Sequence, residues 1–246
     1  MKNTLIVVAV LIVGVLAGVF MFNGSNKEVS SAGQYLNNVV PADYLSMRPE
    51  ISSLPIQGIS EDEKIGLLYM REEEKLARDV YITLYDKWGI QIFSNISQSE
   101  QTHTEAVRAL LVKYSIPDPV VDDTVGVFVN QNLKNLYNDL TKKGLLSRED
   151  ALTVGATIED LDISDLEKYI SKTDNADIKL VYDNLTRGSR NHLRAFVSQL
   201  KTLGITYQPK YITEDEYKQI ISSGVEMGSM MNGGMMRGRG WGYRSF

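Results

Sequence analysis

Four long segments of the chain repeat apolar residues at steps of three and four, and this spacing constrains the fold more than any other feature. Such steps place side chains on one face of an α-helix. We predict helices over 61–87, 91–114, 147–172 and 175–203, and a shorter helix over 133–143. The first helix shows the pattern most clearly, with one apolar face formed by Leu67, Met70, Ala77, Tyr81, Leu84 and Trp88.

The lengths of the connections indicate how these helices are arranged. Short turns join the first helix to the second and the third to the fourth, whereas residues 115–146 form a long connection between the second and the third. Short turns are typical of antiparallel neighbours. We therefore expect an all-α fold over 61–205, a four-helix bundle of two antiparallel hairpins joined by a crossover. The capping box S-R-E-D at Ser147 marks the start of the third helix.

Each predicted helix also places a polar residue near the middle of its apolar face. These acids and histidines are Glu74, Glu100, His103, Glu159, Asp162 and His192. Ionised carboxylates inside a bundle are costly unless they are paired or bound to a metal. No lysine or arginine can be placed among them, since Arg78 and Arg194 lie beside the apolar faces, and Glu72 and Glu73 are expected to lie off the face that carries Glu74. One or two divalent metal ions would compensate the acids, with carboxylates and imidazoles as ligands.

The two halves of the predicted bundle repeat the same order of ligands. Glu74 precedes His103 by 29 residues, and Glu159 precedes His192 by 33. Each pair is a carboxylate on one helix and a histidine on the next helix of the same hairpin. Two such hairpins packed together would form a site with approximate twofold symmetry.

Four stretches of the chain carry a resemblance to a known family: YMREEEKLARDVY, FSNISQSEQTH, GATIEDLDISDL and NLTRGSRNHLRAF. Together, over residues 61–203, they resemble the DUF2202 branch of the ferritin-like superfamily, and the first two also resemble rubrerythrin. The resemblance implies a ferritin-like bundle that binds iron, with manganese or zinc as alternatives. It implies ligands at Glu74, Glu100, His103, Glu159 and Asp162. The fourth helix departs from the family pattern, because Ser189 stands where a glutamate is expected three residues before His192.

Three functions fit such a site. A di-metal carboxylate oxidoreductase would act on peroxide or O₂, with Tyr69, Tyr81 and Tyr182 as hydrogen-bond donors around the ligands. A non-catalytic metal-binding or metal-handling protein of the cell envelope is favoured by Ser189 and by the Met-rich tail. A structural module would keep the helices without the metal. The chain has no cysteine, which excludes disulfides, thiolate zinc sites and iron–sulfur clusters.

The N-terminal part indicates location. The apolar run 5–22 would span roughly 27 Å as a helix at about 1.5 Å per residue, close to the thickness of one hydrocarbon core. We therefore expect residues 1–23 to be an uncleaved membrane anchor, with a cleaved signal and a secreted protein as the alternative. Lys2 on the inner side would leave the domain outside the cytoplasm. Residues 24–60 are expected to form a tether.

The C-terminal part differs again. Residues 206–223 form an extension, and residues 224–246 are a Gly- and Met-rich tail that we expect to be disordered. Thioethers of such a tail could bind Cu(I). The net charge of −5 argues against nucleic acid as a partner. The expected partners are metal ions, peroxide or O₂, and the membrane through residues 1–23; a homodimer is left open.

Overall fold

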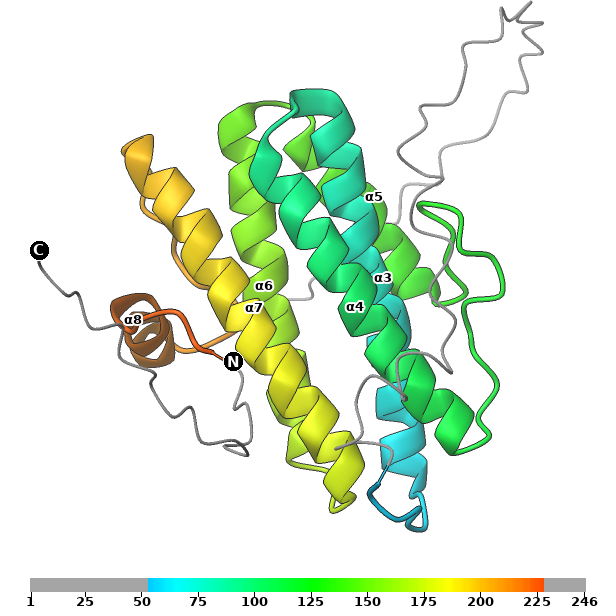
Figure 1. Cartoon of the computed structure of the whole chain (residues 1–246). Helices are drawn as coiled ribbons and strands as arrows, with labels where there is room; N and C mark the ends of the chain where they lie inside the picture. Colours follow the sequence, from blue (N-terminus) through cyan, green and yellow to red (C-terminus); the bar gives the residue numbers. More distant parts are fainter. Residues whose placement is uncertain (1–52, 228–246) are drawn as a thin grey trace, which may run out of the picture. The chain divides into compact units, whose positions relative to one another are not determined.

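A computed structural model describes residues 53–227, which contain six α-helices and no β-strand. The helices are α3 (Glu61–Trp88), α4 (Gln91–Lys113), α5 (Gln131–Gly144), α6 (Arg148–Ile170), α7 (Ala176–Thr202) and α8 (Glu214–Ser222). The prediction of an all-α fold is confirmed for this part of the chain (Figure 1). No helix within 53–227 is long and apolar enough to cross a membrane. The expected anchor at 1–23, almost all of the tether and most of the tail lie outside the described residues.

The four long helices pair in the order of the sequence. α3 packs along α4, and α6 packs along α7, so that each pair forms a helical hairpin (Figure 1). The two hairpins meet through contacts of α3 with α6 and of α4 with α7. The crossover connection carries α5, which packs against α3 and α6. Side chains of all four long helices therefore converge between the hairpins.

Local sequence signals explain where these helices begin and end. α3 is preceded by a capping box in which Ser60 and Glu63 exchange hydrogen bonds, and Ser147 caps α6 by accepting from the Asp150 amide. Gly89 ends α3 in the left-handed conformation, with φ 62°, which glycine adopts at little cost. α8 was not predicted, although Thr213 caps it by accepting from the Glu216 amide.

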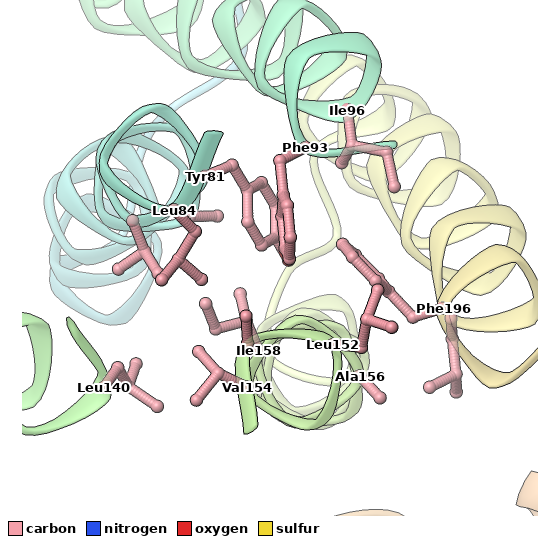
Figure 2. Packing of buried hydrophobic residues seen from close by; sticks show 14 of the residues in the cluster. Tyr81, Leu84, Phe93, Ile96, Leu140, Leu152, Val154, Ala156, Ile158 and Phe196 are labelled. Atoms are coloured by element: carbon pink, nitrogen blue, oxygen red, sulfur yellow. The ribbon is translucent and has the colours of Figure 1, made fainter. Parts of the chain in front are cut away.

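The apolar core consists of two clusters of buried side chains. One is centred on Tyr81, Phe93 and Phe196, whose ring centroids lie 5.4–6.1 Å apart (Figure 2). The other contains Leu67, Met70, Val107, Leu110, Ile178, Val181 and Tyr182. Each long helix contributes to both clusters. Along α3, α4 and α7 the predicted polar residues lie between the two contributions, whereas on α6 Glu159 and Asp162 precede Ile163 of the first cluster. The core thus has a polar layer between two apolar layers.

The glutamate run of α3 corrects one expectation. We expected Glu72 and Glu73 to lie off the buried face, but both are buried together with Glu74. The start of α5 and the crossover cover Glu72, whereas Glu73 lies near Asp165 of α6. Glu72 accepts hydrogen bonds from the amides of Val129, at 2.6 Å, and Asn130. Its role is therefore to fix the start of α5 on α3.

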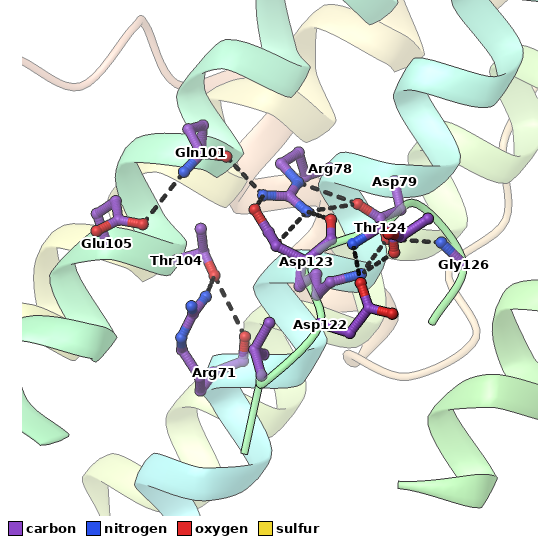
Figure 3. A network of polar contacts seen from close by, with 12 residues as sticks. Arg71, Arg78, Asp79, Gln101, Thr104, Glu105, Asp122, Asp123, Thr124 and Gly126 are labelled. Carbon is purple, nitrogen blue, oxygen red and sulfur yellow. Dashed lines mark hydrogen bonds and ion pairs between the residues drawn. The ribbon is translucent and has the colours of Figure 1, made fainter. Parts of the chain in front are cut away.

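A network of charged side chains attaches the crossover to α3 and α4 (Figure 3). Arg78 donates to Asp79 and to Asp123, with the closest contact to Asp123 at 2.7 Å. Lys75 is fully buried and pairs with Asp79 at 2.5 Å. Arg71 donates to Thr104 of α4. These cations are held by carboxylates and a hydroxyl outside the predicted cluster, so Arg78 does not neutralise the cluster.

Candidate metal centre

Five of the six predicted ligand residues come together in the polar layer between the two hairpins. They form two groups that share Glu100: the first contains Glu74 and His103, and the second contains Glu159 and His192. Within each group, one candidate ligand atom per residue lies within 4.8 Å of the others. The three glutamates are at most 1% exposed. Every long helix supplies at least one member.

The two oxygens of Glu100 face opposite histidines. His103 Nδ1 lies 2.8 Å from Glu100 Oε2 and 3.2 Å from Glu74 Oε2. His192 Nδ1 lies 2.8 Å from Glu100 Oε1 and 3.4 Å from Glu159 Oε2. The two imidazole rings are stacked, with centroids 5.6 Å apart and planes 25° apart. Glu100 is thus the one residue that both groups share.

The polar atoms of this layer include the types of donor that a bound cation takes. Glu100 Oε1 and His192 Nδ1 are buried and face each other as an ion pair at 2.8 Å. Glu74 Oε1 is buried without a partner among the described residues. Buried polar atoms are usually satisfied, and carboxylate oxygens with imidazole nitrogens are ligands that iron, manganese and zinc accept. The donor set therefore fits one or two divalent metal ions.

Electrostatics of the protein alone show what such ions would replace. Burial raises the pKa of Glu74 to about 7, even though His103 lowers it. Burial would also raise the pKa of Glu100, but the two imidazoles bring it well below its usual range. Burial lowers the pKa of His192, but Glu100 and Glu159 outweigh it and raise that pKa to about 10. Protons on the imidazoles therefore balance the carboxylates, and a metal ion would have to displace them.

Asp162, the sixth predicted ligand, lies beside the two groups rather than within them. It is buried, and its Oδ2 accepts a hydrogen bond from Ser189 Oγ. Its Oδ1 has no partner among the described residues. Burial and the charges of neighbouring glutamates raise the pKa of Asp162 well above its usual range. Ser189, which replaces the expected glutamate, thus holds an acid from α6. The ligand role of Asp162 stays a prediction.

One of the three tyrosines expected near the ligands contacts a member of the groups. Tyr81 donates from its hydroxyl to Glu159 Oε1. Tyr69 donates instead to Asp165, at 3.3 Å. The hydroxyl of Tyr182 is buried without a partner among the described residues. Tyr81 therefore couples the site to the apolar cluster around Phe93 and Phe196.

Two residues beside the groups were missed by reasoning from the sequence. Glu73 is buried, and neither of its carboxylate oxygens has a partner among the described residues. Burial, Asp165 and Glu74 raise its pKa well above the usual range. Gly188 lies against His103, since an added Cβ would stand 2.6 Å from Nε2. The signal for Gly188 was present, because it precedes His192 by about one helical turn.

Comparisons with known proteins match this part of the chain. Residues 63–224 match the family described as "Uncharacterized protein domain (DUF2202)". The "Uncharacterized protein MJ0754" of Methanocaldococcus jannaschii is 64% identical over 178 residues, which is 72% of this chain and 96% of that protein. A crystal structure of "hypothetical protein MJ0754" superposes with a TM-score of 0.70 at 64% identity, covering 70% of this chain and 99% of that one. The family match spans more than half of the sequence, and the chain therefore belongs to the DUF2202 family.

Proposed function

We propose that the domain is a ferritin-like four-helix bundle that binds two divalent metal ions and acts as an oxidoreductase on peroxide or O₂. The observation that carries this proposal is the position of Glu100, whose two oxygens lie 2.8 Å from the Nδ1 atoms of His103 and His192. A carboxylate that bridges two sites, each with an imidazole, is the arrangement of ligands in di-metal bundles. The pairing of the helices as two hairpins supports the ferritin-like assignment.

The chain's own residues divide into two sets around Glu100. Glu74 and His103 would hold one ion, and Glu159 and His192 the other. When bound, iron or manganese would supply the change of oxidation state that the reaction needs. Zinc would bind at the same residues without redox activity. The hydroxyl of Tyr81 orients the Glu159 carboxylate and keeps a proton at hydrogen-bonding distance from it.

Two further parts of the layer shape the site. The aromatic cluster beside Tyr81 excludes water on that side. Ser189 donates a hydrogen bond to Asp162 and so keeps this acid turned toward the layer. We place the domain outside the cytoplasm, anchored by residues 1–23, with secretion as the alternative.

A second function is favoured by Ser189. The α6–α7 hairpin offers one carboxylate fewer at the expected position, and a less complete set of ligands suits metal binding without turnover. The methionines of the tail add thioether groups that suit Cu(I). In this alternative the protein is a metal-handling protein of the cell envelope.

Peroxide consumption separates these two functions. The chain, loaded with iron or with manganese, is mixed with hydrogen peroxide and a reductant, and the loss of peroxide is followed against zinc-loaded and metal-free protein in the same mixture. The oxidoreductase predicts turnover with a redox-active metal and a suitable reductant, and none with zinc. Stoichiometric metal binding without turnover for either redox metal would favour metal handling instead.

A further inference from the structure

A hollow between α4 and α7 leads to both histidines. It has a volume of about 360 Å³ and is lined by Ser99, Thr102, His103, Asn184, Arg187, Gly188, Asn191, His192 and Glu226, with Leu185 as the apolar member. The side chains of His103 and His192 are 11% and 12% exposed, whereas the glutamates of the site are essentially closed off. A water molecule takes up about 30 Å³ of liquid, so the hollow has the size for small solutes.

One wall of this hollow is made by the segment that follows α8. Glu226 accepts hydrogen bonds from Arg190 Nε, at 2.9 Å, and from the guanidinium of Arg194. Its backbone exchanges two hydrogen bonds with the side chain of Asn191, at 2.9 and 3.0 Å. Arg194 also donates to the carbonyl of Ile220, at 2.7 Å. Although we expected the disordered tail to begin at residue 224, this segment is held on α7.

Glu226 also contributes a negative charge to the hollow. Arg187 lines the hollow, and Arg190 and Arg194 lie on the same helix. Glu226 is the only carboxylate among the lining residues. Hydrogen bonds from Arg190 lower its pKa to about 2, so it stays ionised at neutral pH. Without this carboxylate, Arg190 and Arg194 would lose the negative charge that they share, and the hollow would attract anions more strongly.

We infer that this hollow is the port through which small uncharged hydrogen-bonding molecules reach the histidine pair, and that Glu226 is a specificity-determining residue that weakens the attraction of the neighbouring arginines for anions. The hydroxyls of Ser99 and Thr102 and the amide groups of Asn184 and Asn191 offer donors and acceptors without net charge. Peroxide belongs to this class of solute. The inference rests on the proposed function in one respect, namely that His103 and His192 belong to the site that the solute must reach.

The absence of cysteine allows a direct test of the port. Ser99→Cys places a single thiol in the lining, and its reaction rate is measured with neutral, anionic and cationic methanethiosulfonate reagents of similar size. The rates are compared in three full-length proteins. One is the single variant Ser99→Cys, and the other two carry Ser99→Cys together with Glu226→Gln or together with Glu214→Gln. The last is a matched control, because Glu214 forms an exposed ion pair with Lys218 on α8 and does not line the hollow. Asn184→Cys repeats the test from the opposite wall.

We expect the neutral reagent to react readily in all three proteins. Glu226→Gln should raise the anionic-to-cationic rate ratio by roughly fivefold or more, the size expected for one charge at short range in a partly hydrated hollow. Glu214→Gln should leave the ratio unchanged. An unchanged ratio in Glu226→Gln, or thiols at both 99 and 184 that react with no reagent, would overturn the inference. The thiol rates are read without any metal, so failure of the port and failure of metal binding are seen separately.

Discussion

The two hairpins offer the candidate site the same kinds of ligand but unequal numbers of carboxylates. Glu74 and His103 on α3 and α4 correspond to Glu159 and His192 on α6 and α7. Three residues before its histidine, α4 carries Glu100, whereas α7 carries Ser189. The two carboxylate oxygens of Glu100 each lie 2.8 Å from an imidazole Nδ1 atom, one of His103 and the other of His192. Glu100 therefore belongs to both groups of candidate ligands, whereas the α6–α7 hairpin has no counterpart of it.

Ser189 avoids a further buried acid and also contributes a hydrogen bond. A glutamate there would add a further acid to a buried layer that already contains Glu73, Glu74, Glu100, Glu159 and Asp162. Instead, the serine hydroxyl donates to Asp162. The α6–α7 half therefore replaces one potential negative charge by a hydrogen bond to an existing acid. The proposed asymmetry can be tested by changing one half at a time.

Ser189→Glu should have the largest effect on the metal-free protein. The site is fully buried, so a new carboxylate would lack a partner and would lower the free energy of unfolding by about 3–5 kcal/mol. The same change adds a ligand, so added metal should recover much of this loss. Chemical denaturation with and without metal measures both effects. Ser189→Ala is the control, since it removes the hydroxyl without adding charge, and equal losses in the two variants would contradict the account.

Gly188→Ala should disturb the α3–α4 half selectively. The new methyl group would stand 2.6 Å from His103 Nε2 and would force the imidazole to move. Overpacking of this kind costs about 1–3 kcal/mol. We expect a lower thermal midpoint and weaker metal binding in the group that contains Glu74. The control is Gly58→Ala, where an added Cβ meets no atom within 4 Å. If both alanine variants bind metal alike, the contact between Gly188 and His103 does not matter.

The stability of the metal-free protein should fall as the pH rises from about 5 to 10. The folded-state pKa values of Glu74, about 7, and His192, about 10, lie above the ordinary values of 4.5 and 6.5. The folded state therefore binds more protons than the unfolded state in this window, and the stabilisation is lost as the pH passes these values. Metal replaces the protons, so the metal-induced rise in thermal midpoint should grow over the same range. Thermal melts at several pH values check this, and a metal effect that shrinks with rising pH would contradict it.

Tyr81→Phe should have the smallest effect. It removes the hydroxyl that donates to Glu159 and leaves a buried acceptor with one partner fewer, at a cost of about 1 kcal/mol. Metal affinity in the α6–α7 half should fall several-fold. Tyr182→Phe is the matched control, because the Tyr182 hydroxyl has no partner among the described residues. Isothermal titration calorimetry compares the metal affinities of the two variants. Equal affinities would show that the Tyr81 hydroxyl does not contribute to metal binding.

The features that follow local rules could be predicted from the sequence. The long helices lie within two residues of their predicted bounds, because apolar spacing and capping residues fix them. The same spacing brought five of the six predicted ligands together. The burial of Glu72 could not be predicted in this way, because the distant crossover covers that side of α3. The place of Glu226 on α7 also depends on contacts far apart in the sequence.

The metal content of Glu100→Ala tests the sharing of Glu100 most directly. The metal content is measured by elemental mass spectrometry after loading with metal and removal of excess ions. The proteins compared are the wild type and the single variants Glu100→Ala, His103→Ala and His192→Ala. We predict two ions per wild-type chain, one for each group. Each histidine variant should retain about one ion, whereas folded Glu100→Ala should lose both. A Glu100→Ala protein that keeps the wild-type metal content would contradict the account.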